Sequence, residues 1–578
     1  MDITSTPSRR RFLKTTAAVA GASALPFGSA LAQGSTRYSR RNVSDPKLPA
    51  RVLESYKKAI RVMLALPAGD PRNWYRNAII HTLDCPHGNW WFLVWHRAYL
   101  GWFEQICREL SGDPEFALPY WDWTEHLDSS KPFQPRIPTV MFDDVLSPTN
   151  AAYVGKYTDF KAHFKDVVAK ANYWERVYES NGVFKEKSPY GQLLARGIRF
   201  PEDLWFDIVD DPRGKMFFDL AHGRGLTKQK PEFDARTTKA VSLSYLLDAL
   251  SARDFTTFGS PKTISHGVLT GFGVLEGLPH NRVHNNVGGI STVADMHGDP
   301  VRTDVGGFMQ NNLSPVDPLF FLHHANIDRL WDVWTRKQQA FGYPILPTGY
   351  PVQPGTPVPE GSDYELWSTE QFFFFVDAKA RPVSKTNAGD YAAIGDFSYS
   401  YQLGSGEEIV PTAAVAAVAG TAQIQRFSAQ IVNPSLSTAV TTSGGVVKVP
   451  SALLAATGRT GAPKLFARVT IALPPLAHFG DFAVLANAPG DAVRIDPASP
   501  HYVATLSMFG HHNLCAPVTF TVPLSGTLGA LRSAERLNPE APLNIRVVPE
   551  LSAKHEGMML AFGTRLRGEI VSIVVEAH

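Results

Sequence analysis

Residues 81–96 read HTLDCPHGNWWFLVWH, and this stretch guides the interpretation of the whole chain. It combines large aromatic rings with four side chains that can bind a metal ion: His81, Cys85, His87 and His96. The apolar periodicity of residues 89–110 predicts a helix that carries His96. His81 ends an earlier helical segment, and His87 lies in the loop between the two. Because imidazoles bind Cu, Zn, Fe or Ni, the stretch predicts a metal site in an apolar interior.

Two later segments offer a second set of histidines. PHNRVHNN contains His280 and His284, whose spacing of four puts both imidazoles on one face of a helix. DPLFFLHHANIDRLW contains His323 and His324, with Asp328 one turn beyond His324, where its carboxylate could orient that imidazole. A buried His–Asp hydrogen bond in an ordinary amphipathic helix is the alternative.

Two three-histidine clusters from helices favour a dinuclear site inside a four-helix bundle. A single three-histidine cluster could also hold zinc. The spacing alone does not show that the two clusters face each other.

The composition narrows the class of protein. A length of 578 residues corresponds to about two to four domains. The 12 Trp and 34 Phe residues favour a packed globular enzyme. The net charge is +2, and no basic stripe or nucleic-acid-binding motif is present, so we expect no nucleic-acid partner.

The N-terminal residues are typical of an export signal. SRRRFLK, residues 8–14, precedes a short Ala-rich apolar stretch that contains Pro26, and Ala30-Leu31-Ala32 fits a small-x-small cleavage site. We therefore predict a twin-arginine signal peptide at 1–32 and export to the periplasm or the medium. We expect no membrane anchor, because the apolar stretch is too short to span a bilayer.

The remaining chain divides by its periodicity. Helical patterns cover 50–66, 89–110 and 317–337, and a short helix follows Pro279 and ends at Gly288-Gly289. Beyond residue 367, FFFFVD and YSYQ are predicted strands. Later β-rich runs, punctuated by Pro and Gly, predict an antiparallel β-sandwich or, as the alternative, a barrel.

We accordingly expect a mainly α catalytic domain at 33–405, which contains a long mixed insertion at 125–265. A small-residue linker should follow at 406–424, and a β-rich domain at 425–578.

Two signatures make the chain similar to the tyrosinase and haemocyanin superfamily. His87-GNWWFLVW-His96-RAYLGWF-Glu104 resembles the CuA signature, and Asp317-PLFFLH-His324-ANI-Asp328 resembles the CuB signature. PHNRVHNNVGG and PYWDW, which ends at Trp123, also resemble family motifs. The resemblance covers roughly residues 38–402. It extends more loosely to the C-terminal domain of long tyrosinases and plant polyphenol oxidases.

The resemblance implies two copper ions, Cu A and Cu B. Cu A would be held by His81, His87 and His96, and Cu B by His280, His284 and His324. The family spacing to Asp328 selects His324, so His323 is interpreted as a neighbour. The implied activity uses O2 to hydroxylate monophenols to o-diphenols or to oxidise o-diphenols to o-quinones.

The resemblance also implies roles for residues around the copper ions. Glu276 and Asn281 resemble a pair that holds a water to deprotonate monophenols, although Glu276 could simply support the helix. Asn285 occupies a neighbouring position that tunes this step. A substrate gate is expected within 308–315. Cys85 resembles the cysteine that forms a thioether with the second CuA histidine, here His87, and an unmodified buried thiol is the alternative.

A tyrosine motif at Tyr399 and Tyr401 is expected to pack on an N-terminal arginine, for which Arg41 is the candidate. The β-rich domain is expected to cover the site and keep the enzyme latent. Three alternatives remain: a catechol or o-aminophenol oxidase, an O2 carrier of haemocyanin type, and a single-cluster zinc hydrolase. No feature of the sequence specifies an oligomeric state.

Overall fold

The computed structural model describes residues 37–153, 156, 223–289, 292–294, 300–302, 307–310, 312–351, 355–412, 423–436, 442–472, 481–489, 496–509, 516–550 and 568–578. The predicted signal peptide, residues 154–155 and 157–222 of the predicted insertion, the middle of the predicted linker and Cys515 lie outside these residues.

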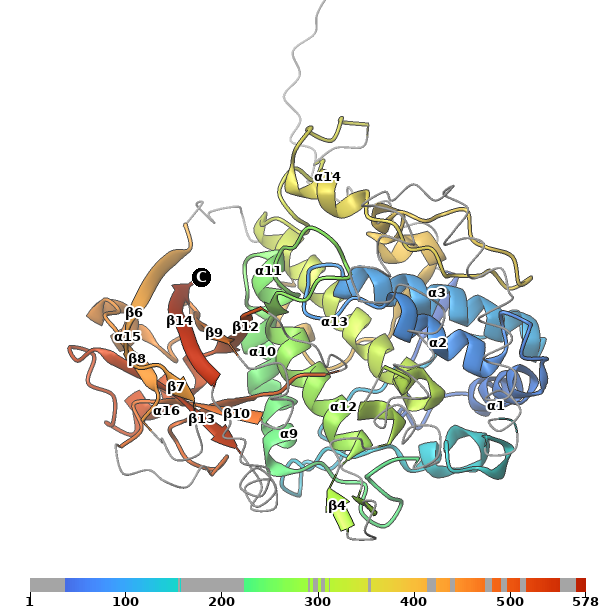
Figure 1. The fold of residues 1–578 in the computed structure, drawn as a ribbon, viewed down its shortest axis with the longest axis horizontal. Helices are drawn as coiled ribbons and strands as arrows, with labels where there is room; N and C mark the ends of the chain where they lie inside the picture. The colour runs from blue at the N-terminus through green and yellow to red at the C-terminus, as the bar shows by residue number, and fades with distance from the viewer. Residues whose placement is uncertain are drawn as a thin grey trace, which may run out of the picture.

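Long helices form the body of the molecule, beside a β-sheet built from the C-terminal region (Figure 1). The main helices are α1 (Ala50–Ala65), α2 (Trp74–Asp84), α3 (Phe92–Ser111), α12 (Asn281–Gly288) and α13 (Leu319–Phe341). They confirm the helices predicted from periodicity to within a few residues at each end. Shorter helices complete the body: α9 (Ala235–Ala240), α10 (Leu243–Leu250), α11 (Phe255–Phe258) and α14 (Asp363–Ser368).

Local signals in the sequence explain where α13 begins and ends. Asp317 precedes it, and its carboxylate accepts a hydrogen bond from the backbone N–H of Leu319 at 2.9 Å. Gly342 ends it in the left-handed conformation, with φ of 69°. Between these ends nearly every side chain up to Trp334 is buried, so α13 lies in the centre of the body.

The C-terminal strands form one continuous sheet of ten strands, in the order β11-β10-β13-β8-β6-β14-β9-β12-β2, with β7 paired to β14. These strands are β6 (Gln425–Asn433), β7 (Ser435–Leu436), β8 (Gly444–Val447), β9 (Leu465–Ala472), β10 (Asp481–Ala486), β11 (Tyr502–Leu506), β12 (Val518–Pro523), β13 (Leu543–Glu550), β14 (Gly568–Ala577) and β2 (Gly271–Phe272). Helices α15 (Ser451–Ala456) and α16 (Ser525–Ser533) accompany them.

This single sheet differs from the expected sandwich of two sheets and is closer to the expected alternative, a barrel. Strands β6 and β9 to β14 lie in the predicted β-rich runs, whereas β2, β7 and β8 were not predicted, and the pairing is antiparallel except between β12 and β2. The sheet curls until β11 and β12 touch, although several strands separate them in the hydrogen-bonded order. Strand twist accumulates across a large sheet, so one sheet can close over its own core.

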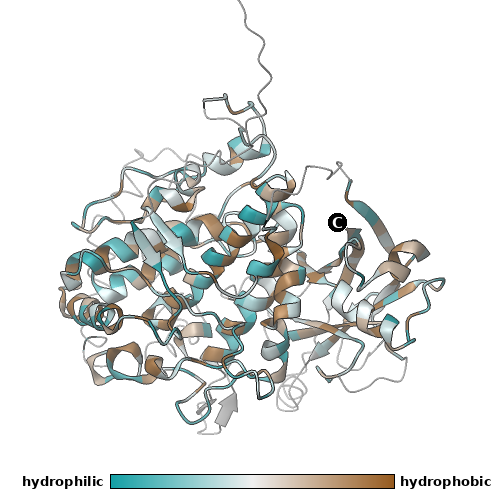
Figure 2. Ribbon diagram, turned by 180° about the vertical axis from the view of Figure 1, so that it is seen from behind, coloured by the Kyte–Doolittle hydropathy of each residue, from teal (hydrophilic) through white to brown (hydrophobic). Residues whose placement is uncertain are grey.

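The short strand β2 joins the sheet to the body. Gly271 and Phe272 pair in parallel with Thr519 and Phe520 of β12. One buried hydrophobic core runs from the helices of the body into the sheet. Figure 2 shows hydrophobic and hydrophilic residues alternating along the helices, as expected for amphipathic helices packed on this core. None of the helices in the described ranges combines the length and the apolar character needed to span a bilayer.

The run FFFFVD, residues 372–377, was wrongly predicted as a strand. It forms only isolated bridges, such as Val376 with Pro382. Phe374, Phe375 and Val376 are buried in succession, so the segment lacks the alternation of a half-exposed strand. Aromatic packing therefore determines its course.

Strands β1 (Tyr38–Arg40) and β5 (Tyr399–Tyr401) pair in parallel, as expected for the two ends of the body. The arginine that packs on the tyrosines is Arg40 and not Arg41. The Arg40 guanidinium lies 3.6 Å from the centre of the Tyr399 ring, donates to Glu104 at 2.8 Å, and is fully buried. Because side chains alternate along a strand, the neighbouring Arg41 points outward and pairs with Asp45.

Candidate metal centre

The first histidine cluster is held by two helices and the loop between them. His81 lies in the last turn of α2, His96 in the first turns of α3, and His87 in the connecting loop. One ligand atom from each, together with the sulfur of Cys85, falls within 4.8 Å of the others. All four side chains are buried.

Hydrogen bonds to backbone carbonyls orient the rings of this cluster. His81 Nδ1 lies 2.7 Å from the carbonyl oxygen of Asn312, and His96 Nδ1 lies 2.8 Å from that of Phe92. A carbonyl can only accept, so each Nδ1 carries the proton and each Nε2 presents a lone pair. This arrangement is typical of histidines that ligate metals.

The second cluster is built from α12, the turn before it, and α13. His280 closes the π-helical turn Glu276–His280, His284 follows on α12, and His323 and His324 lie on α13. Their ligand atoms also fall within 4.8 Å of one another. His284 donates through Nδ1 to the Met309 carbonyl at 2.6 Å, which leaves its Nε2 3.1 Å from His324 Nε2.

The indole of Trp123 distinguishes His323 from His324. It donates to His323 Nδ1 at 3.1 Å, so a neutral His323 ring keeps its proton on Nε2 and has no lone pair for a metal there. His280 Nε2, His323 Nε2 and His324 Nδ1 are all buried without a hydrogen-bond partner. The unpaired His280 Nε2 and the two Nε2 atoms of His284 and His324, 3.1 Å apart, fit a shared metal ion.

The two clusters face each other across the interior. The rings of His96 and His324 stack in parallel with their centres 4.0 Å apart, and those of His87 and His280 lie 5.8 Å apart. Spacing in the sequence could not show this arrangement, which depends on the packing of α3 against α13.

Burial keeps these imidazoles neutral. It lowers the pKa of His96, His284 and His324 well below the usual value, and lowers the pKa of His280 to about 3. Neutral imidazole is the form that binds metal ions. A buried donor set of imidazoles only, without carboxylates, suits copper.

Glu276 is fully buried between the two clusters. One carboxylate oxygen accepts from the backbone N–H of Gly88 at 2.7 Å, and the other accepts from the hydroxyl of Ser260. Burial raises the pKa of Glu276 well above its usual value, and these two bonds oppose the rise. Gly88 directly follows His87, and Glu276 lies in the turn that ends at His280. The carboxylate therefore connects the loop of the first cluster to the turn that holds one histidine of the second cluster.

Asn281 and Asn285 contact the C-terminal region. Asn281 accepts from His280 Nδ1 at 2.9 Å and donates to the carbonyl of Ser507 at 2.8 Å. Asn285 donates to the carbonyl of Met508 at 3.1 Å. Both amides are therefore engaged by the chain just after β11.

Asp328 does not orient His324, contrary to the expectation from its spacing. Its carboxylate accepts from Arg97 at 2.7 Å, from Tyr401 at 2.7 Å and from Tyr399. The helix turns Asp328 toward the β1–β5 pair, where these cations and hydroxyls stabilise its buried charge.

Cys85 lies beside two of the histidines. Its sulfur is 3.7 Å from His87 Nε2 and 3.4 Å from His96 Nε2, and the side chain is buried. The sulfur is close enough for a covalent bond to His87 after a small movement of either side chain.

The predicted gate, 308–315, contacts both clusters through its backbone. The Met309 carbonyl accepts from His284 and the Asn312 carbonyl accepts from His81. This segment therefore orients one histidine of each cluster.

The sequence interpretation did not identify Phe509. Its ring centre lies 4.1 Å from that of His284, 5.1 Å from that of His87 and 5.5 Å from that of His280. Nothing in the local sequence SMFG marks this residue, because its position depends on how the sheet docks.

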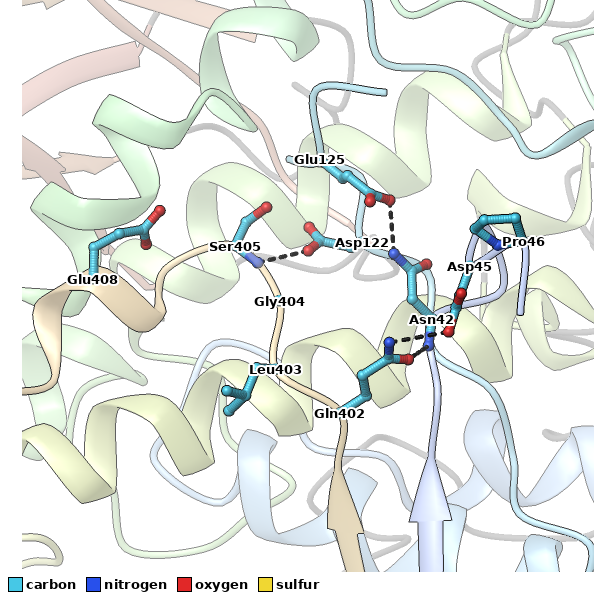
Figure 3. Close-up of a pocket in the computed structure, with 10 residues that line it drawn as sticks. All are labelled: Asn42, Asp45, Pro46, Asp122, Glu125, Gln402, Leu403, Gly404, Ser405 and Glu408. Carbon is cyan, nitrogen blue, oxygen red and sulfur yellow. Dashed lines mark hydrogen bonds between the residues drawn. The ribbon is translucent and has the colours of Figure 1, made fainter. Parts of the chain in front are cut away.

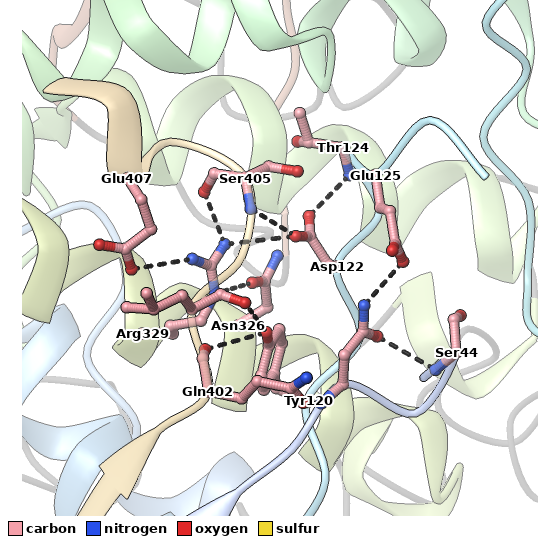
Figure 4. A network of polar contacts seen from close by, with 12 residues as sticks. Ser44, Tyr120, Asp122, Thr124, Glu125, Asn326, Arg329, Gln402, Ser405 and Glu407 are labelled. Carbon is pink, nitrogen blue, oxygen red and sulfur yellow. Dashed lines mark hydrogen bonds and ion pairs between the residues drawn. The ribbon is translucent and has the colours of Figure 1, made fainter. Parts of the chain in front are cut away.

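A separate cavity of about 330 Å³ lies away from the histidines, among the acidic residues near the end of the body (Figure 3). Asp122 accepts from the backbone of Ser405 at 2.7 Å on its wall. Figure 4 shows the adjoining network, in which Arg329 donates to the Ser405 carbonyl and pairs with Asp122 and Glu407. These contacts hold the segment that leads into the predicted linker.

Comparisons with known proteins agree with this geometry. Residues 71–337 match the family model described as the common central domain of tyrosinase, and residues 6–26 match that of the twin-arginine translocation pathway signal sequence. A chloroplastic polyphenol oxidase of Spinacia oleracea is 26% identical over 357 residues, which cover 57% of this chain and 42% of the relative. The (+)-larreatricin hydroxylase of Larrea tridentata is 27% identical over 297 residues, covering 49% of this chain and 38% of the relative.

The chain thus spans about two fifths of the length of these curated relatives. Among solved structures, a latent aurone synthase (polyphenol oxidase) superimposes with a TM-score of 0.50 at 19% identity, covering 95% of this chain and 92% of its own, which shows the shared fold. Both histidine clusters lie within the matched central domain, and they fit the two copper sites of that family. The central part of this chain, residues 71–337, is therefore similar to the common central domain of tyrosinase, its two buried histidine clusters fit two copper ions, and a twin-arginine signal sequence precedes it.

Proposed function

We propose that the protein is a tyrosinase that hydroxylates monophenols to o-diphenols and oxidises o-diphenols to o-quinones with O2. We further propose that it is latent until the C-terminal region moves. The observation that carries this proposal is the pair of facing histidine clusters, buried together beneath Phe509.

In this proposal one copper ion is held by His81, His87 and His96, and the other by His280, His284 and His324. Bound copper supplies the redox chemistry with O2. The chain contributes neutral, pre-oriented imidazoles and an interior from which aromatic rings exclude water. Helices α2, α3, α12 and α13 would be the four-helix bundle, and the packing of α3 on α13 supports this assignment.

Glu276 and Asn281 are the proposed pair that handles the proton of a monophenol. The raised pKa of Glu276 brings it closer to that of a general base useful near neutrality. Asn285 would tune the same step, and the 308–315 segment would line the approach of the phenol.

One observation favours a second candidate, a catechol oxidase or o-aminophenol oxidase without monophenolase activity. Both oxygens of Glu276 are already bonded, to Gly88 and Ser260, so a water or a phenol would have to displace one of these donors. A carboxylate held in this way fits a supporting role as well as a catalytic one.

Latency is supported by the contacts around Phe509. Its ring covers His284, while the carbonyls of Ser507 and Met508 occupy the amides of Asn281 and Asn285. Arg282 lies between His280 and His284 in the sequence. It donates to the Ser507 hydroxyl at 2.8 Å and to Asp481 of the sheet. The same segment thus blocks the copper face and engages the residues proposed to act on substrate.

We propose a body at 33–405, a linker at 406–424 and a covering domain at 425–578. We also propose that Cys85 forms a thioether with His87, with loss of two hydrogen atoms to O2 as oxidant. The exported protein would act in the periplasm or outside the cell.

The test measures O2 uptake by the copper-loaded protein with a monophenol and with its o-diphenol, before and after removal of the residues beyond 410. Turnover of both substrates that rises on removal supports the proposal. Turnover of the o-diphenol alone supports the catechol oxidase. Reversible oxygenation without phenol turnover would indicate an O2 carrier. Fewer than two coppers per chain would support the alternative of a single-cluster zinc hydrolase.

A further inference from the structure

His266 lies between two buried carboxylates next to the first cluster. Its Nδ1 is 2.7 Å from Glu370 Oε1 and its Nε2 is 3.1 Å from Asp84 Oδ1. The three side chains are at most 3% exposed. None of the proposed copper ligands is part of this bridge.

The geometry requires a proton in addition to the one on a neutral imidazole. A neutral ring has a single N–H, yet both nitrogens of His266 face carboxylate oxygens. Both carboxylates also accept other N–H groups, Asp84 from the Trp95 indole at 2.9 Å and Glu370 from the His266 backbone at 3.0 Å, which is typical of ionised acids. Burial opposes a charge on His266, but Asp84 and Glu370 raise its pKa.

Asp84 connects this bridge to all three histidines of the first cluster. It is the last residue of α2, one turn beyond His81, and it stands three residues before His87. Its second oxygen holds the indole of Trp95, which directly precedes His96 and lies against its ring.

The backbone around His266 holds the same loop. Asn89 donates to the carbonyls of His266 at 2.9 Å and of Val268 at 3.1 Å. The carbonyl of Gly88 accepts from the backbone of Thr270 and Gly271. The segment 266–271 therefore holds the loop that carries His87. Among the described residues that make these contacts, His266 is the only buried cation.

We infer that His266 is a positioning residue for the first copper site. As an imidazolium held between Asp84 and Glu370, it fixes the loop from Asp84 to His87. It has no such role at the second site. This inference rests on the copper assignments proposed above. Removing the cation would leave two buried carboxylates without the positive charge between them, and the loop would have to move to hydrate them.

The test compares wild-type protein with His266→Gln, both loaded with Cu(II) and then dialysed. Gln can donate a hydrogen bond but carries no charge. Three quantities are measured: copper per chain, the EPR signal, and the mass of the peptide that spans Cys85 and His87. We expect copper affinity at the first site to fall about 10-fold or more, as for other residues that support metal ligands. The variant should therefore retain one copper, which gives the EPR signal of an isolated Cu(II) ion, and should lose the thioether.

Two further variants keep the inference falsifiable if His266→Gln does not fold. Asp84→Asn should reproduce the selective loss. Glu370→Gln should have a smaller effect, because it leaves the Asp84–His266 bond in place.

Asp248→Asn is the matched control. It removes a carboxylate that is 5% exposed and that accepts from Lys464 and the backbone of Gly526, neither of which is a proposed copper ligand. It should lower stability and leave both coppers bound.

Two coppers and a normal thioether in folded His266→Gln would overturn the inference, as would equal loss from both sites in His266→Gln and Asp84→Asn. If wild-type protein itself fails to bind two coppers, the proposed function fails instead, so the two failures are distinguishable.

Discussion

The Phe509 ring lies over the imidazole of His284, with ring centres 4.1 Å apart and planes inclined by 35°. One residue comes from the segment after β11 and the other from α12, so the contact joins the C-terminal sheet to the copper-binding body. It places a hydrophobic side chain directly against a proposed copper ligand.

Phe509→Ala should therefore raise o-diphenol turnover of the full-length, copper-loaded protein several-fold without any proteolysis. The reason is that the ring is removed while the Ser507 and Met508 carbonyls still hold the segment. Initial rates of quinone formation provide the measurement. Phe427→Ala, on the partly exposed strand β6, is the control, and equal rates for all three proteins would reject Phe509 as the blocking residue.

His324→Asn and His323→Asn should differ in copper content. His324 presents a nitrogen to the second site, whereas Trp123 holds His323 in the tautomer that cannot ligate through Nε2. Metal analysis should find about one copper fewer in His324→Asn and an unchanged count in His323→Asn. The reverse result would reassign the ligand.

Glu276→Gln should separate the two candidate activities. Gln preserves an acceptor for Gly88 and can donate to Ser260, so the fold should be retained. If Glu276 acts as the base, monophenol turnover should fall by about 100-fold or more while o-diphenol turnover changes little. A ratio of the two rates equal to that of wild type would assign Glu276 a supporting role only.

Arg40→Met should destabilise the protein by about 3–5 kcal/mol, because it removes a fully buried cation that pairs with the buried carboxylates of Glu104 and Asp328. Arg41→Met should cost less than about 1 kcal/mol, because the Arg41–Asp45 pair is partly exposed. Denaturant unfolding of the two variants measures the difference, and similar losses would contradict the assignment of Arg40 as the inward arginine.

Glu576 should make the C-terminal strand sensitive to acid. Burial opposes its ionisation, but the nearby His578 imidazole, the hydrogen bond from Arg426 and the charge of Arg468 lower the pKa of Glu576 from 4.5 to about 2. A carboxyl with a lowered pKa stabilises the fold above its unfolded pKa, and this stability is lost as the pH falls from about 5 to about 2. Wild type should exceed Glu576→Gln by roughly 2–3 kcal/mol at neutral pH, with the gap closing below pH 5. A gap independent of pH would refute the assignment.

The sequence by itself determined the elements with strong local periodicity. Helices α1, α3 and α13 and strands β6 and β9 to β14 lie where the apolar pattern predicted them, because burial of one face imposes that pattern along the chain. The family signatures likewise marked the histidines that the structure brings together, and their spacing to Asp328 favoured His324.

Only the tertiary structure decided which groups those elements bring into contact. Arg40 instead of Arg41, Asp328 facing Arg97 instead of His324, and one curled sheet instead of two all depend on contacts between distant segments. Phe509 and His266 carry no local signature, because each gains its role from partners that are more than 100 residues away in the chain. Periodicity reports how much of a residue is buried, whereas the packing of helices and strands fixes which neighbour it meets.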